Sequence, residues 1–172
     1  MSTFCLDTSV IEPLTTGRHP LSSELREWFD RNEKLCFISA VSHFEMAFGT
    51  LRLAVRKSEE DRIRAHRISV ISKFFLLKMG PRTIEINATI LAHAAGLRVL
   101  AERLCGDIGA CDAIIAASAE LAGHVLVSMN VKHFAATGVR VVDASRLLNG
   151  EESHVDVAMS RPSWPLDRTI VH

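Results

Sequence analysis

The sequence lacks a net charge, because its 172 residues include 20 Lys and Arg and 20 Asp and Glu. The overall charge therefore does not indicate a polyanion partner. The sequence also lacks an apolar run long enough to span a bilayer. Asp7 interrupts the first apolar run, which argues against a secretory leader. We therefore expect a cytoplasmic protein that does not enter a membrane.

The sequence has few cysteines, and Cys5, Cys36, Cys105 and Cys111 form no Cys-X-X-Cys pair. A structural zinc site is therefore not expected. Cys5 and Cys36 lie in apolar runs, where we expect buried, reduced thiols. The sequence also contains no Walker loop, no Gly-X-Gly-X-X-Gly turn and no Gly-X-Ser-X-Gly motif. These absences argue against a nucleotide cofactor and against a nucleophilic side chain.

Strands and helices alternate along the sequence. Short apolar runs predict strands at residues 3–6, 35–38, 83–86, 125–128 and 139–142. Helical spacing and capping residues predict helices at residues 22–31, 40–51, 59–79, 88–104, 110–121 and 145–148. This pattern predicts an α/β fold, with a central parallel sheet covered on both faces. We expect one domain over residues 1–150 and a C-terminal tail over 151–172, either flexible or docked as an arm through Trp164.

Two aspartates stand where a purely structural acid would be costly. Asp7 ends the first apolar run, and ligands of open parallel sheets bind at the carboxyl ends of strands. Asp112 is the single acid in the first part of an almost wholly apolar helix, so it needs a cap, a partner, a proton or a metal. The alternatives are a turn or N-cap role for Asp7 and a favourable helix-dipole position for Asp112.

Glu45 is a third candidate, because Phe44 and Phe48 flank it and Gly49 follows four residues later. We expect Glu45 to border the buried face of its helix, beside the space that the glycine leaves open. The alternative is an ordinary solvated glutamate. Carboxylate oxygens without neighbouring His or Cys ligands suit Mg²⁺ or Mn²⁺. Such an ion lowers the pKa of a bound water and supports displacement at phosphorus.

Four motifs in chain order resemble those of PIN-domain proteins, and most of all the VapC-type toxins of bacterial toxin–antitoxin pairs. The motifs are Leu6–Ser9, Phe44–Gly49, Asp112–Ala117 and Val127–Asn130. The resemblance covers roughly residues 3–148. It implies a Rossmann-like α/β/α sandwich and a Mg²⁺- or Mn²⁺-dependent endoribonuclease that cleaves RNA. It also implies a homodimer and a cognate antitoxin that silences it.

The resemblance assigns a role to each matching residue. Asp7, Glu45 and Asp112 correspond to the catalytic and metal-binding acids. Thr8 or Ser9 corresponds to a polar helper beside the first acid. These assignments predict that the three acids share one site.

The fourth motif departs from the family pattern. Ser128 stands where the family often has threonine, so a hydroxyl is kept, but Asn130 stands where many relatives have a fourth aspartate. With three acids, we expect one tightly held metal and a second that arrives with the substrate. His133 is expected to be a surface residue rather than a ligand, and Asp107 an ordinary loop or capping residue.

Residues 51–82 form a basic segment with nine basic and three acidic side chains. The segment could attract RNA phosphates. It could also be the solvated face of an amphipathic helix, which is sufficient to explain most of these residues. Both interpretations are compatible, with a minority of the basic residues touching RNA. The second one predicts that the apolar face is buried, at Ile63, Ile68, Ile71, Phe74 and Phe75.

Two other functions compete with the endoribonuclease. A phosphatase with Asp7 as nucleophile would need a second aspartate at position 9, where Ser9 stands. A PIN scaffold could also be catalytically weak or inactive and serve for binding alone. Asn130 is the residue that favours this second alternative.

Overall fold

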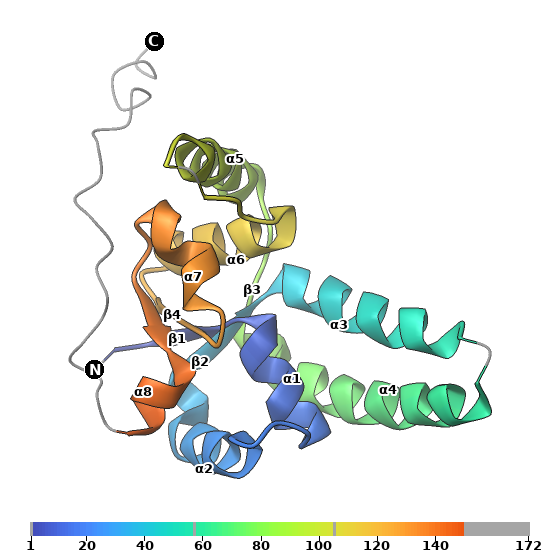
Figure 1. The fold of residues 1–172 in the computed structure, drawn as a ribbon. Helices are drawn as coiled ribbons and strands as arrows, with labels where there is room; N and C mark the ends of the chain where they lie inside the picture. The colour runs from blue at the N-terminus through green and yellow to red at the C-terminus, as the bar shows by residue number, and fades with distance from the viewer. Residues whose placement is uncertain (1, 57, 105, 150–172) are drawn as a thin grey trace.

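A computed structural model describes residues 2–56, 58–104 and 106–149 (Figure 1), so the predicted tail at 151–172 and Cys105 lie outside the described residues. The described chain forms one five-stranded sheet in the order β3-β2-β1-β4-β5. All neighbouring strands are parallel, which confirms the predicted sheet. The strands are β1 (Phe4–Leu6), β2 (Cys36–Ser39), β3 (Thr83–Ile84), β4 (Val125–Ser128) and β5 (Val141–Asp143).

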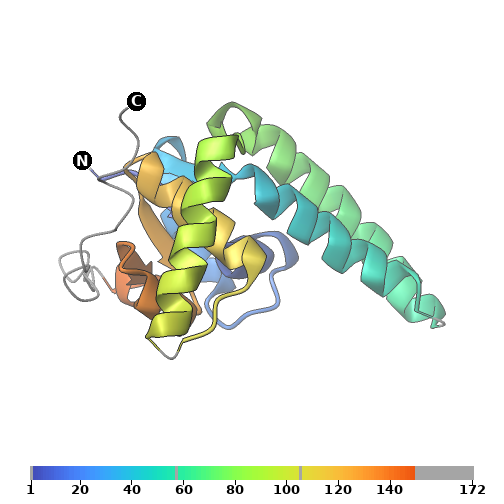
Figure 2. The same cartoon turned by 90° about the horizontal axis from the view of Figure 1, so that it is seen from above.

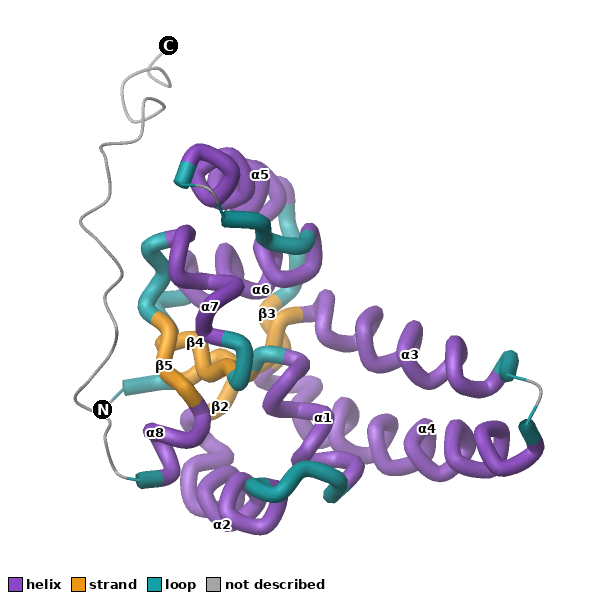
Figure 3. The backbone as a smooth tube through the Cα atoms, viewed as in Figure 1, coloured by secondary structure: helices purple, strands orange, loops and turns teal. Residues whose placement is uncertain are grey.

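Helices connect the strands and cover both faces of the sheet, which appears as the orange central layer in Figure 3. They are α1 (Thr8–Thr16), α2 (Ser22–Asn32), α3 (Ala40–Ala54), α4 (Glu59–Met79), α5 (Ala88–Arg103), α6 (Ala110–Leu121), α7 (Val131–Phe134) and α8 (Ala144–Leu148). None of these described helices is long and apolar enough to cross a membrane. The predicted helices are present, whereas α1 and α7 were not predicted.

The core is divided by the sheet, because successive side chains of a strand point to opposite faces. Phe4 and Leu6 of β1 pack in one cluster with α1, α2 and α8. Cys5 packs in the other cluster, together with side chains of α5 and α6. Cys5 and Cys36 are buried free thiols, as expected. The two clusters give the predicted α/β/α sandwich.

Helices α3 and α4 form a hairpin that projects from the sandwich (Figures 1 and 2). The exposed side of α3 and its C-cap residue carry large apolar side chains, which we call the α3 stripe: Phe44, Phe48, Leu51 and Val55. Phe44 is 59% exposed and Phe48 is 54% exposed, so the expectation that they mark a buried face is wrong. The physical reason is that the hairpin leaves the sandwich, so α3 is covered mainly along the side that faces α4.

The same correction applies to α4. Ile63, Ile71 and Phe74 are exposed rather than buried. Ile68 and Phe75 are half-buried. The basic segment is therefore not simply the solvated face of an amphipathic helix, because the apolar face of that helix is not fully buried. It lies on a projecting hairpin with apolar and basic side chains on its surface.

Candidate active site

Asp7 lies at the carboxyl edge of the sheet, directly after β1. Its backbone N–H donates to the Val127 carbonyl at 2.9 Å, and its side chain is 4% exposed. The carboxylate Oδ2 accepts hydrogen bonds from Ser9 Oγ at 2.5 Å and from Ser128 Oγ at 2.7 Å. Asp7 occupies the N-cap position of α1, yet its side chain makes no capping hydrogen bond. The N-cap alternative therefore does not explain this side chain.

The two serines are themselves held by the start of the segment after β4. Ser9 Oγ accepts from the Met129 N–H at 3.1 Å, and Ser128 Oγ accepts from the Asn130 N–H at 2.9 Å. Each hydroxyl accepts a hydrogen bond from a backbone N–H and donates one to the Asp7 carboxylate. Asn130 contributes through its backbone, and the residue is exposed. This network fixes the Asp7 carboxylate, and both serine bonds use Oδ2 and leave Oδ1 to other partners.

Glu45 reaches the same edge from α3, which begins directly after β2. Thr8 Oγ1 donates to Glu45 Oε2 at 2.6 Å. Burial raises the pKa of Glu45, the Thr8 hydrogen bond opposes this, and the charges of Asp112 and Asp7 raise it further. Gly49 is exposed on the same helix one turn later, and a Cβ there would meet no atom within 4 Å. The expected open space beside Glu45 is thus confirmed.

Asp112 lies in the first turn of α6, a helix whose N-terminal end adjoins the same edge. Burial raises its pKa, as does the charge of Asp7, whereas His133 lowers it. His133 Nδ1 lies 3.6 Å from Asp112 Oδ2, and its side chain is 57% exposed. His133 is therefore a surface residue, as expected, but one that touches the candidate site. Asp107 is exposed in the loop before α6.

The three acids interact electrostatically without forming a finished metal site. Within residues 2–56, 58–104 and 106–149, no three His, Cys, Asp or Glu side chains form a group ready to hold an ion. The charge of Asp7 nevertheless raises the pKa of both Glu45 and Asp112. A half-buried set of hard oxygens that repel one another fits a divalent cation, which would offset that repulsion. Asp7, Glu45 and Asp112 are the residues that would hold it.

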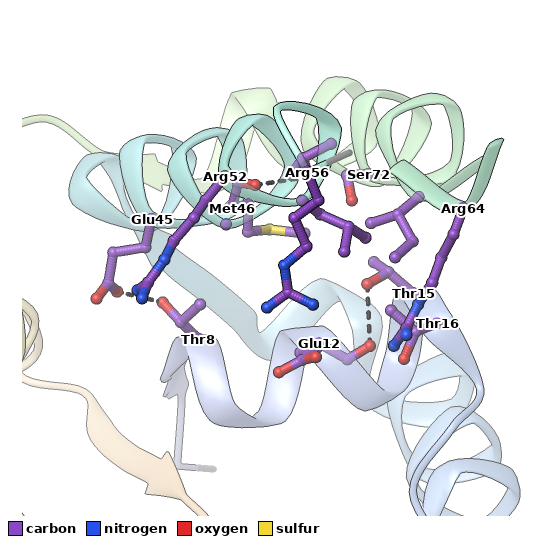
Figure 4. A pocket seen from close by; sticks show the side chains of 14 residues that line it. Thr8, Glu12, Thr15, Thr16, Glu45, Met46, Arg52, Arg56, Arg64 and Ser72 are labelled. Carbon is purple, nitrogen blue, oxygen red and sulfur yellow. Dashed lines mark hydrogen bonds between the residues drawn. The ribbon is translucent and has the colours of Figure 1, made fainter. Parts of the chain in front are cut away.

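A cavity of about 450 Å³ opens next to Glu45, between α1, α3 and α4 (Figure 4). Arg52, Arg56 and Arg64 of the basic segment line it. The sequence predicts the basic segment as a whole but does not distinguish these arginines from its other basic residues. Gly49 followed by Arg52, at i and i+3 on one helix, was the pattern that could have identified them.

Comparisons with known proteins place these features in a family. The family model described as PIN domain matches residues 4–139. No curated protein sequence matches the chain.

Among solved structures, a DNA-bound VapBC from Salmonella typhimurium is similar at a TM-score of 0.66 and 23% identity, covering 83% of this chain and 98% of that one. FitAcB from Neisseria gonorrhoeae reaches a TM-score of 0.65 at 21% identity, covering 81% and 96% of the two chains. VapBC2 from Rickettsia felis, bound to a promoter DNA fragment, reaches 0.61 at 19% identity, covering 82% and 98%. At these identities the similarity concerns the fold.

Proposed function

The chain belongs to the PIN-domain family, and on this premise we propose that it is a metal-dependent endoribonuclease, the toxin of a toxin–antitoxin pair. PIN domains are generally nucleases. The observation that carries the proposal is that Asp7, Glu45 and Asp112 all lie at the carboxyl edge of the sheet, close enough for the charge of Asp7 to raise the pKa of the other two. RNA is the proposed substrate, and the cytoplasm is the proposed site of action.

Each residue of the candidate active site has a proposed role. Asp7, Glu45 and Asp112 would hold Mg²⁺ or Mn²⁺, which when bound lowers the pKa of a water and offsets charge at the reacting phosphate. Ser9 and Ser128 orient the Asp7 carboxylate, because both donate to Oδ2. Thr8 holds Glu45 toward the site through its 2.6 Å hydrogen bond. Asn130 brings no charge, so we propose one tightly held ion and a second that arrives with the RNA.

A cognate antitoxin and a homodimer complete the proposal. Several structures with this fold are toxin–antitoxin complexes, including one from Klebsiella pneumoniae at a TM-score of 0.56 and 22% identity. This similarity supports an antitoxin partner. The α3 stripe supports a homodimer, because several adjacent exposed apolar side chains are typical of an interaction surface.

RNA cleavage in the presence of Mn²⁺ tests the proposal. We expect the wild-type protein to cut RNA and Asp7→Asn to lose the activity at least a hundredfold, because a buried ligand becomes neutral. Asp107→Asn is the matched control, since Asp107 is an exposed aspartate of the adjoining loop, and it should cut like the wild type. Equal cleavage by wild type and Asp7→Asn would show that the activity belongs to a contaminant.

A catalytically weak binding module is the second candidate. Two observations favour it: the uncharged Asn130 in the fourth motif, and the lack of a ready-made group of three metal ligands in the described part of the chain. Calorimetry with Mn²⁺ separates the two candidates. Binding that Asp7→Asn abolishes supports the enzyme, whereas no heat at millimolar Mn²⁺ supports the binding module.

A further inference from the structure

The cavity beside Glu45 has the position and the size of a ligand site. The hydrogen bond from Thr8 to Glu45 lies at one end, and α1 faces α3 and α4 across the cavity (Figure 4). Its volume of about 450 Å³ falls in the range of small-molecule sites in proteins. A ligand in this cavity would therefore lie directly beside a carboxylate of the candidate active site.

Three arginines line the cavity, together with one exposed acid, Glu12, so its rim is predominantly cationic. Arg52 extends from α3 on the side of Glu45, Arg56 from the segment just after α3, and Arg64 from α4 at the opposite end (Figure 4). All three residues are exposed, so their guanidinium groups are accessible. Arg56 makes a loose ion pair with Asp61 at 3.9 Å, a contact of the kind that contributes little. Guanidinium groups bind phosphate through two parallel hydrogen bonds, so this rim suits a phosphate-bearing ligand.

The inside of the cavity differs from its rim. Met46, Leu53 and Ile68 give it apolar walls. Ser72 also lines it, is 5% exposed, and has an Oγ atom without a hydrogen-bond partner in the part of the chain that the structure describes. A buried hydroxyl without a partner is costly, and a polar ligand atom would remove that cost. The cavity therefore combines cations at the rim, apolar walls and one unpaired hydroxyl.

We propose that this cavity is a subsite for a single nucleotide of the RNA strand, adjacent to the phosphodiester that is cut. This inference rests on the proposed function. The arginines bind the flanking phosphates, the apolar walls contact the faces of an unstacked base, and Ser72 forms a hydrogen bond with its edge. An unstacked base is available in single strands and loops, so the subsite selects unpaired RNA over a duplex.

Gly49 keeps the subsite open. It lies on α3 one turn after Glu45, and an added Cβ would meet nothing within 4 Å. A larger side chain at this position would consequently enter the cavity without displacing protein atoms near its Cβ. Gly49→Leu therefore places an apolar side chain in part of the cavity while it leaves all three acids and all three arginines in place.

The test measures binding of a fluorescein-labelled, single-stranded oligoribonucleotide by fluorescence anisotropy, with Asp7→Asn in every protein to prevent cleavage. We expect Gly49→Leu, and separately the pair Arg52→Ala and Arg56→Ala, to weaken binding at least tenfold. Arg98→Ala is the matched control, because Arg98 is an exposed arginine of α5 outside the cavity, and it should change the affinity less than twofold. Thermal unfolding of each variant verifies that it is folded, and the arginine pair keeps the test decisive if Gly49→Leu fails to fold.

A second measurement locates the nucleotide. Titration with nucleoside monophosphates should shift the backbone NMR signals of Gly49 and Ser72, and Ser72→Ala should change the order of preference among the four bases.

An oligonucleotide affinity that stays the same in all of the cavity variants would overturn the subsite and leave the cavity to a protein segment. Because these measurements need no cleavage, an inactive protein with variant-sensitive binding would contradict the nuclease alone. Active cleavage with variant-insensitive binding would contradict the subsite alone.

Discussion

Ser128 shows how single residues hold the candidate site together. It is fully buried, donates to Asp7 Oδ2 at 2.7 Å and accepts from the Asn130 N–H at 2.9 Å. Ser128→Ala leaves a buried carboxylate oxygen with one donor fewer and a backbone N–H without its acceptor. We expect a loss of about 1–3 kcal/mol in the free energy of unfolding, measured by urea denaturation.

Ser42→Ala is the control for this prediction. Ser42 is also fully buried, but its Oγ has no hydrogen-bond partner among the described residues. Removing that hydroxyl should leave stability unchanged or raise it slightly, because no bond is lost. Equal losses in the two variants would mean that the hydrogen bond to Asp7 contributes nothing beyond the volume of a serine side chain.

The repulsion among the three acids predicts a pH dependence. The pKa of Glu45 and that of Asp112 are raised, first by burial and then by neighbouring charges that include Asp7. The folded chain therefore binds these two protons more tightly than the unfolded chain. Without a metal, these groups disfavour folding at neutral pH, and this penalty disappears as the pH falls through their raised pKa values.

Asp7→Asn tests this coupling directly. Removing the negative charge of Asp7 should lower the pKa of Glu45 and of Asp112 toward ordinary carboxyl values. The pKa values can be followed by NMR titration of the side-chain carboxyl carbons in metal-free protein. Asp107→Asn, outside the cluster, should leave both unchanged. An unchanged pKa of Asp112 in Asp7→Asn would show that the two carboxylates do not interact.

The sequence predicted the members of the site better than their connections. Asp7 and Asp112 were candidates because each lies next to apolar residues at a predicted strand or helix end, and Glu45 because aromatic residues flank it within its helix and Gly49 follows one turn later. Their catalytic roles stay a prediction. The hydrogen bond of Ser128 with Asp7 joins residues 121 positions apart, and no local pattern contains that information.

At the scale of elements, N-terminal caps differ in what their side chains do. Asn87 caps α5, because its Oδ1 accepts from the Ile90 N–H at 3.0 Å. Ser39 occupies the same position of α3 but makes no capping bond, and its Oγ lies 3.0 Å from Ser118 Oγ. Serine and asparagine are both favoured at the N-cap, so their residue types do not tell the two positions apart. Only the packing of α6 against β2 distinguishes them.

Asn87→Ala should therefore destabilise the protein by about 1 kcal/mol, since a helix N–H loses its acceptor. Asn87→Gly should cost only a few tenths of that amount, because glycine is tolerated at the N-cap through its backbone. Urea denaturation of the three proteins gives the order of stabilities. A Gly variant as unstable as the Ala variant would mean that the side chain stabilises the fold through contacts other than the cap.

Helix α1 shows why some elements are not predicted from the sequence. It contains Pro13, a residue that disfavours a helix interior, and it directly follows a strand and a turn-like Asp7. Tertiary packing outweighs this local preference, because Val10, Ile11 and Leu14 are buried in the cluster beneath α1. The parallel sheet, in contrast, was predictable, since continuous apolar runs that alternate with helices leave few other folds.

At the scale of the whole molecule, the hairpin of α3 and α4 gives the protein two different surfaces. One side borders the cavity with its arginines, and the other carries the α3 stripe. Phe44 and Phe48 stack there, with ring centroids 5.8 Å apart. The sequence could not place these aromatic side chains, because their spacing is the same for a buried face and for an interface.

The stripe predicts the oligomeric state. Its residues follow at spacings of four, three and four, which resembles the seam of two packed helices, so a second copy can cover it along its length. We expect a dimer by light scattering at micromolar concentration, and a monomer for the pair Phe44→Ser and Phe48→Ser, because two large apolar contacts are lost from each copy. Leu121→Ser is the matched control: Leu121 is 48% exposed at the end of α6, away from the hairpin, and the variant should remain dimeric. A wild-type protein that stays monomeric, or a dimer that survives both serine substitutions, would contradict this interface and leave the α3 stripe to a different partner.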